Sequence, residues 1–160
     1  MAAPVQLCDI VSDAAPAHES RFALAQINLE QRCAADLIVT ADGTALRRAV
    51  DNLLSNALNN TPDHGTIRID IDRTNEGSDV EIALSDTGTG FPAKFLPYAF
   101  ERFRKADAVR TRALGGGSGL GLAIVLEIAT WQGGSATAMN LPEGGARVVV
   151  RIPISRRSGS

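Results

Sequence analysis

The sequence predicts an α+β protein, a two-layer α/β sandwich in which three helices cover one face of a mixed, mostly antiparallel sheet. Apolar residues recur at helical spacing in three segments, and apolar and polar residues alternate in several others, as strands require. A chain of 160 residues is also long enough to bury one proper core. We therefore expect one domain at residues 1–154 and a loose tail at residues 155–160.

The N-terminal segments predict a helix and two strands. Residues 7–17 have the pattern of a helix, which Pro16 is expected to kink or end. Residues 25–30 and 37–40 are expected to pair as a short hairpin. A longer helix follows and ends in the Thr-Pro-Asp turn that begins at Thr61.

The second half of the chain alternates strands with one long connection and one helix. The connection, at about residues 91–116, exceeds an ordinary loop, and loops of that length are usually functional or disordered. The strands are expected at residues 66–72, 80–85, 135–140 and 146–154, and the third helix at residues 118–131.

Two glycine clusters flank the long connection. They read DTGTG at residues 86–90 and GGGSGLG at residues 115–121. A glycine run that leads into a helix can cradle an anion, because unpaired N–H groups and the helix dipole face the ligand together. The spacing excludes a P-loop, since no lysine follows the glycines, and no three of them fit G-x-G-x-x-G.

The middle helix carries a row of asparagines beside its apolar stripe. It should begin near Asp42 or Thr44, since both side chains suit the N-cap position. At about 100° per residue, four asparagines fall within one arc of roughly 100°. They are Asn52, Asn56, Asn59 and Asn60. A solvated polar face of the helix explains Asn60 well, but it explains Asn52 and Asn56 in the middle of the helix poorly. An amide oxygen at these positions can complete the shell of a hard cation whose other ligands are phosphate oxygens and water.

These segments resemble the boxes of the Bergerat-type ATPases, which include sensor histidine kinases, DNA gyrase and mismatch-repair ATPases. The asparagine helix resembles the N box, and residues 86–90 resemble the first glycine box, D-x-G-x-G. FERFRKAD at residues 100–107 resembles the F box of histidine kinases, and GSGLGL at residues 117–122 the second glycine box. The resemblance runs from about residue 5 to residue 154 and implies the Bergerat fold, with the connection as an ATP lid.

The resemblance implies ATP and Mg²⁺ as cofactors and assigns residues to them. Asp86 would accept a hydrogen bond from the adenine amino group, although a turn-forming aspartate also fits the motif. Gly88 and Gly90 would let the backbone approach the base, and Asn56 matches the magnesium ligand. The full nucleotide set is Asn56, Asn59, Asn60, Asp86, Gly88, Gly90, Phe103, Gly117, Ser118, Gly119, Leu120 and Gly121.

Position 52 separates the chemistries of the family. Hydrolytic members carry a glutamate there as general base, whereas Asn52 is an amide that cannot accept a proton at neutral pH. This favours phosphoryl transfer to a histidine, as in two-component signalling. Asn52 and Asn56 are the expected catalytic residues, together with Arg102 and Lys105, which match F-box cations that face the phosphates.

The phosphoacceptor histidine is not evident in the chain. His18 begins His-Glu-Ser-Arg, which echoes the H-box core, but Phe22 stands where Thr-Pro would begin, so a helix histidine is the better interpretation. We expect a separate or removed phosphoacceptor and dimerisation domain, inactivity without it, and indirectly a response regulator. The alternatives are an anti-sigma-factor-type serine kinase and a non-catalytic nucleotide-sensing module.

Two residues depart from the family pattern. Relatives commonly carry a cation at position 59 and an aromatic residue at position 60, which touch the phosphates and the adenine ring. This chain has Asn59 and Asn60 instead. We therefore expect weak nucleotide affinity.

Composition limits the other functions. The net charge of −2 gives no sign of nucleic-acid binding. No secretory signal or membrane-length apolar segment is visible, so we expect a cytoplasmic protein without membrane contact. Cys8 and Cys33 are expected to be free thiols, and no cysteine or histidine spacing supports zinc.

Overall fold

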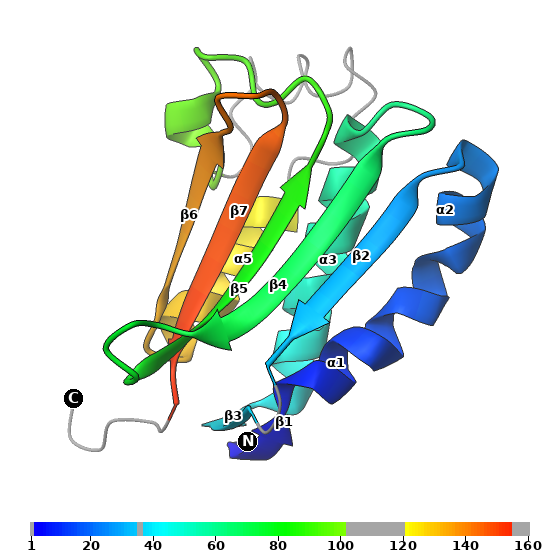
Figure 1. Ribbon diagram of the computed structural model, residues 1–160. Coiled ribbons are helices and arrows are strands. Elements are labelled where there is room, and N and C mark those ends of the chain that lie inside the picture. Colours follow the sequence, from blue (N-terminus) through cyan, green and yellow to red (C-terminus); the bar gives the residue numbers. More distant parts are fainter. Residues whose placement is uncertain (1, 35–36, 102–120, 155–160) are drawn as a thin grey trace.

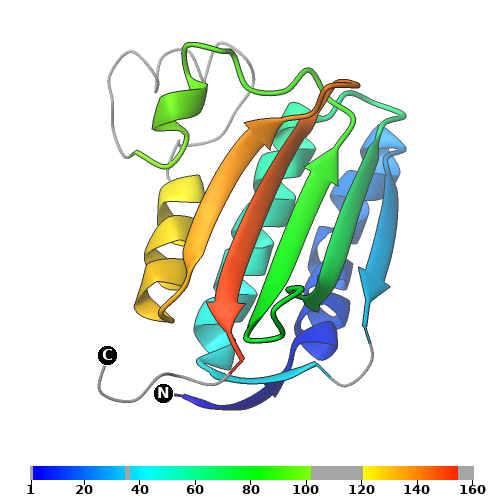
Figure 2. The same ribbon diagram turned by 60° about the vertical axis from the view of Figure 1, so that its left-hand side comes forward.

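The protein folds as two layers, with the helices packed on one face of a five-stranded sheet (Figure 1). This computed structural model describes residues 2–34, 37–101 and 121–154. Figure 2 shows the sheet in front and the helical layer behind it. The predicted two-layer α+β sandwich is therefore confirmed.

The main sheet has the strand order β2-β4-β5-β7-β6. Among its described strands, β2 and β4 run parallel and every other neighbouring pair is antiparallel. The strands are β2 (Asn28–Cys33), β4 (Thr66–Arg73), β5 (Asp79–Asp86), β6 (Ser135–Asn140) and β7 (Ala146–Pro153). The prediction of a mixed, mostly antiparallel sheet is confirmed, and the four later strands lie within two residues of their expected bounds.

The expected hairpin between residues 25–30 and 37–40 is wrong. β2 pairs with β4, whereas β3 (Ile38–Ala41) pairs antiparallel with β1 (Ala3–Gln6) in a separate two-stranded sheet. A parallel pair needs a long crossover connection. The segment containing β3 and the long helix provides that connection between β2 and β4.

The first helix ends earlier than expected but the chain stays helical. α1 (Leu7–Ala14) passes through a 3-10 turn, η1 (Ala15–His18), into α2 (Glu19–Ala25). Pro16 lies in the first turn of η1, directly after α1, and it has no N–H with which to continue the α-helical ladder beyond Ala15. α2 ends at Gln26, which adopts the left-handed conformation with φ 54°.

α3 (Gly43–Asn60) is the long central helix, and α5 (Gly121–Trp131) packs beside it. Asp42 is the N-cap, because its side chain accepts a hydrogen bond from the Ala45 N–H at 3.1 Å. The buried stripe of α3 faces the sheet. It consists of Leu46, Ala49, Val50, Leu53, Leu54, Ala57 and Leu58. Among the described helices, none combines the length and apolar character needed to cross a bilayer.

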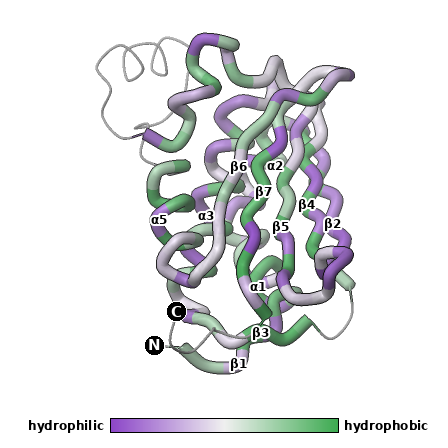
Figure 3. Tube along the Cα trace, turned by 90° about the vertical axis from the view of Figure 1, so that its left-hand side faces the viewer, coloured by the Kyte–Doolittle hydropathy of each residue, from purple (hydrophilic) through white to green (hydrophobic). Residues whose placement is uncertain are grey.

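The sheet buries alternate residues against this helical layer. On β4, Ile67, Ile69 and Ile71 are at most 2% exposed, while the residues between them are only half-buried. Each fully buried isoleucine contributes about 1.5–3 kcal/mol relative to an exposed one. Figure 3 shows mostly hydrophobic residues along β7 and mostly hydrophilic ones along the β2 edge.

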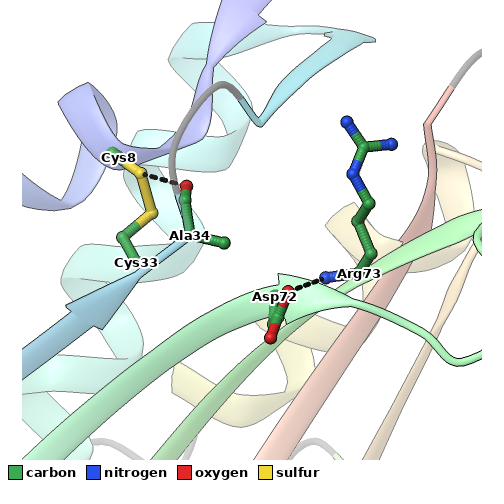
Figure 4. The surroundings of a disulfide bond; sticks show 5 residues. All are labelled: Cys8, Cys33, Ala34, Asp72 and Arg73. Carbon is green, nitrogen blue, oxygen red and sulfur yellow. Dashed lines mark hydrogen bonds between the residues drawn. A yellow bond between two sulfur atoms is a disulfide. The ribbon is translucent and has the colours of Figure 1, made fainter.

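Cys8 and Cys33 form a disulfide bond, so the expectation of free thiols is wrong. The bond joins the start of α1 to the end of β2 across a sequence separation of 25, with the two Cα atoms 5.8 Å apart (Figure 4). The Cys8 sulfur also lies 3.3 Å from the carbonyl oxygen of Ala34. The sequence did not reveal this pairing because α1 and β2 meet only in the folded chain.

Candidate functional site

Asp86 is the last residue of β5, where main-chain groups surround its carboxylate. It lies opposite Ile67 of β4 and is only 6% exposed. Its Oδ1 accepts hydrogen bonds from the Gly88 N–H at 2.8 Å and the Ala146 N–H at 3.3 Å. Burial raises the pKa of the Asp86 carboxyl above its ordinary value, while the two hydrogen bonds act in the opposite direction.

The two carboxylate oxygens of Asp86 differ in their hydrogen bonds. Both hydrogen bonds reach Oδ1, and Oδ2 has no hydrogen-bond partner among the residues that the structure describes. The bond from Gly88 closes the turn, as the turn-forming interpretation of Asp86 predicts. One oxygen therefore holds the loop, and the other can accept a hydrogen bond from an amino group such as that of adenine.

Two glycines are required by packing around Asp86. Gly145 has φ 93°, and a Cβ there would overlap the carbonyl oxygen of Asp86. A Cβ at Gly88 would overlap the carbonyl oxygen of Asn60 at the end of α3. These glycines thus bring the end of β5 against both the β6–β7 turn and the asparagine helix.

Asn140, at the end of β6, fixes the first residues after β5. Its Oδ1 accepts a hydrogen bond from the Phe91 N–H at 2.8 Å, and its Nδ2 donates to the Phe91 carbonyl at 2.9 Å. Gly90, with φ 80°, leaves room for this amide, because a Cβ there would lie 2.7 Å from the same Oδ1. Phe91 is buried, and its ring contacts Phe95 with centroids 6.0 Å apart. The segment expected to form the lid therefore starts from an anchored point.

The asparagines of α3 extend from α5 to the end of β5. Asn52 faces the start of α5, since a Cβ at Gly121 would lie 3.9 Å from its Oδ1. Asn56 follows one helical turn later and is half-buried. The Asn60 carbonyl reaches the Gly88 loop. The structure thus places Asn52, Asn56 and Asn60 on successive turns of α3 between Gly121 and the Gly88 loop.

Asn59 contacts the N-terminal helices instead. Its Oδ1 accepts a hydrogen bond from Arg21 Nη2 at 2.7 Å, and Arg21 Nη1 donates to Ser55 Oγ at 3.1 Å. On the same side of α3, His18 Nε2 lies 3.0 Å from Asp51 Oδ1, and the histidine side chain is 14% exposed. His18 therefore ties η1 to α3, which supports its interpretation as a helix histidine.

Several predicted site residues fall outside the part of the chain that the structure describes. They are Arg102, Phe103, Lys105, Gly117, Ser118, Gly119 and Leu120. Within the described ranges, no three histidine, cysteine or acidic side chains gather as a metal site. The amide oxygen of Asn56 is the expected magnesium ligand, and it suits a hard cation that takes its other ligands from phosphate and water.

Sequence reasoning missed four residues that contact the predicted site residues. Asn140, Gly145 and Ala146 lie at the end of β5, and Arg21 of α2 hydrogen-bonds to the asparagine helix. The first three sit in or beside a Pro-Glu-Gly-Gly turn, whose residues indicate only a turn. Arg21 lies in a helical segment where a charged residue indicates only a solvated face.

One family model matches residues 41–156, and its description is histidine kinase-, DNA gyrase B- and HSP90-like ATPase. The match covers most of the chain and includes the asparagine helix, Asp86 and both glycine clusters.

Curated relatives are sensor histidine kinases. Sensor histidine kinase component HK1 of Mycobacterium tuberculosis is 41% identical over 141 residues, which cover 87% of this chain and 80% of that protein. A probable sensor histidine kinase HK from another strain of this species is also 41% identical over 141 residues. This chain spans only 36% of that second relative.

Solved structures share the fold. The catalytic domain of histidine kinase ThkA matches 98% of this chain and 99% of its own, with a TM-score of 0.83 and 21% identity. ThkA in complex with response regulator protein TrrA matches 98% of this chain and 43% of its own, with a TM-score of 0.80 and 21% identity. Together with the family model and the relatives, the site geometry leads to one conclusion. The chain belongs to the histidine kinase-, DNA gyrase B- and HSP90-like ATPase family, as the ATP-binding catalytic domain of a sensor histidine kinase.

Proposed function

We propose that this chain binds Mg-ATP and transfers the γ-phosphoryl group to a histidine on a phosphoacceptor and dimerisation domain. That domain is either a separate protein or a segment outside this chain. The observation that carries the proposal is Asp86, a buried carboxylate with one oxygen held by backbone N–H groups and the other without a hydrogen bond to any described residue. It lies beside the row of asparagines on α3.

Asp86 would select adenine over guanine. Its open oxygen accepts a hydrogen bond from the adenine amino group, whereas guanine presents a carbonyl at the corresponding position. A carbonyl there would leave the buried acid unpaired, which costs about 1–3 kcal/mol or more for a charged group. ATP should therefore bind far more tightly than GTP.

The α3 asparagines would act on the phosphates. The amide oxygen of Asn56 would hold Mg²⁺, which when bound neutralises charge on the phosphates. Asn52 cannot take a proton from water at neutral pH, which protects ATP from hydrolysis. The acceptor imidazole nitrogen forms a bond to the γ-phosphorus, the bond to the β–γ bridging oxygen breaks, and ADP leaves. On the lid, Arg102 and Lys105 would face the same phosphates.

The acceptor histidine must come from elsewhere. This chain has two histidines, of which His18 pairs with Asp51 and His64 lies in the turn after α3 with φ 70°. ThkA has been solved with a response regulator protein. We therefore propose that the chain is inactive without its phosphoacceptor, and that a response regulator receives the phosphoryl group from that partner.

A transfer assay tests the proposal. The chain would be incubated with γ-labelled Mg-ATP and a panel of histidine-containing dimerisation hairpins from sensor kinases. We expect acid-labile label on a hairpin and none on the chain alone. Asn56→Ala should abolish transfer, since it removes the metal ligand.

The matched control is Asn75→Ala, the same substitution at an exposed residue of the β4–β5 turn, which should leave transfer intact. Full transfer by the Asn56→Ala variant would contradict the assignment of the metal ligand. Label on the chain alone that disappears in His18→Ala would show instead that His18 is the phosphoacceptor.

A further inference from the structure

We propose that Arg21 of α2 is a phosphate-binding residue of this site, which places a positive charge beside the α3 asparagines from outside the predicted motifs. The inference rests on the proposed binding of Mg-ATP. It assigns a function to a residue that the sequence motifs do not include.

The Arg21 guanidinium is held on α3 by two hydrogen bonds. Nη1 donates to Ser55 Oγ at 3.1 Å and Nη2 donates to Asn59 Oδ1 at 2.7 Å. These two acceptors come from successive turns of the helix, so they fix both the position and the plane of the group. A guanidinium held in one orientation loses less side-chain freedom when it binds a ligand.

The charge of Arg21 is not neutralised by a carboxylate among the described residues, because both of its acceptors are uncharged. Three other arginines differ in this respect. Arg47 pairs with Asp51, Arg68 with Asp70, and Arg151 with Glu81. Of the described cations, Arg21 is the one that hydrogen-bonds to an asparagine of α3.

The position of Arg21 brings this charge close to the proposed metal ligand. Ser55 precedes Asn56 directly, and Asn59 lies three residues after it, where neighbouring helix side chains are about 5–6 Å apart between Cβ atoms. A guanidinium has five N–H donors, of which two are used here. The remaining three can reach a polyphosphate bound at Asn56, and the planar fork suits phosphate oxygens.

A purely structural function for Arg21 would have different consequences. Exposed contacts of this kind contribute about 0–1 kcal/mol to stability. If Arg21 only joined α2 to α3, its loss would weaken the binding of every adenine nucleotide equally. A phosphate-binding residue instead contributes more to the binding affinity as the number of phosphates in the nucleotide rises.

The experiment measures Mg-dependent binding of ATP, ADP and AMP by calorimetry to wild type, Arg21→Gln, Arg21→Lys and Arg48→Gln. Arg48 is the matched control, because it is an exposed arginine near the start of α3 and its loss changes the net charge equally. We expect Arg21→Gln to weaken ATP binding about tenfold, equivalent to about 1.4 kcal/mol. The loss should be smaller for ADP and smallest for AMP.

Arg21→Lys should recover part of the ATP affinity, since it keeps the charge but not the fork, and Arg48→Gln should match wild type. Unchanged ATP affinity in Arg21→Gln, or an equal loss for ATP and AMP, would overturn the inference and leave ATP binding by the chain intact. If wild type bound none of the three nucleotides, the proposed function itself would fail.

Discussion

Two regions border the asparagines of α3, and they are built in different ways. At the end of β5, backbone groups of Gly88, Ala146 and Gly145 surround Asp86. In the N-terminal flank, the helical segment at residues 7–25, side chains make the polar and covalent contacts with α3 and β2.

Covalent and polar side-chain contacts join the flank to α3 and β2, in addition to the apolar packing of α1 on α3. The covalent and polar contacts include the disulfide Cys8–Cys33, the pair His18–Asp51 and the Arg21 contacts with Ser55 and Asn59. Backbone contacts do not depend on the identity of one side chain, whereas each side-chain contact can be removed by a single substitution. If the chain binds ATP as proposed, the end that contacts the base is held by backbone groups, and the end near the phosphates depends on side chains.

Gly145→Ala is expected to have the largest effect on stability, because it disrupts the backbone contacts around Asp86. The φ of 93° disfavours any side chain, and the new Cβ would overlap the Asp86 carbonyl. Strain of about 1–2 kcal/mol and overpacking of about 1–3 kcal/mol together predict a loss of about 2–5 kcal/mol in unfolding free energy.

The control for that variant is its neighbour. Gly144 has φ 106°, but no atom lies within 4 Å of the position that a Cβ would take there, so Gly144→Ala should lose only the strain. Urea denaturation of the two variants measures the difference. Equal losses would mean that the close approach of Gly145 to Asp86 does not matter for stability.

Removal of the disulfide should have the next largest effect, because it frees the flank without touching the β5 end. A bond that closes a separation of 25 residues stabilises a fold by about 3 kcal/mol through its effect on the unfolded chain. Wild type with and without reductant, and the double variant Cys8→Ser/Cys33→Ser, should be compared by urea denaturation.

Reductant should lower the stability of wild type to that of the double variant and leave the variant unchanged. An unfolding midpoint that is the same with and without reductant would contradict a stabilising disulfide. ATP selectivity over GTP should survive reduction, since Asp86 keeps its backbone partners.

Asp86→Asn should separate stability from binding. The amide oxygen can accept the same two backbone hydrogen bonds, while the NH₂ group faces the adenine amino group and cannot accept from it. The free energy of ATP binding should become less favourable by about 1.5–3 kcal/mol, as expected for the loss of a hydrogen bond to a charged group. Folding should not be harmed. Calorimetry with ATP and GTP checks the binding, and unchanged ATP affinity would remove Asp86 from the site.

The pH dependence gives this variant a second test. Burial raises the pKa of the folded Asp86 carboxyl above the ordinary 3.8, so its favourable contribution is present below that value and is lost as the pH rises through the raised pKa. The Asp86→Asn variant does not lose this stability, because its side-chain amide does not ionise. Across that window the variant should therefore gain stability relative to wild type as pH rises, measured by urea denaturation at each pH.

The local features of this protein could be predicted from the chain alone. Alternation at residues 66–72 marked β4, and the asparagine row marked the polar face of α3, because side-chain direction follows directly from strand and helix geometry. The order of the boxes indicated the family. Asp86 at the end of β5 was predictable for the same reason, since the motif and the strand that precedes it are continuous in sequence.

The distant residues that contact the predicted site residues became evident only in the folded molecule. Asp86 meets Ala146 across 60 positions, Phe91 meets Asn140 across 49, and Arg21 meets Asn59 across 38. The parallel pairing of β2 with β4 and the disulfide are likewise long-range. Such contacts depend on how the layers pack, and packing between distant segments leaves no periodic signal in the chain.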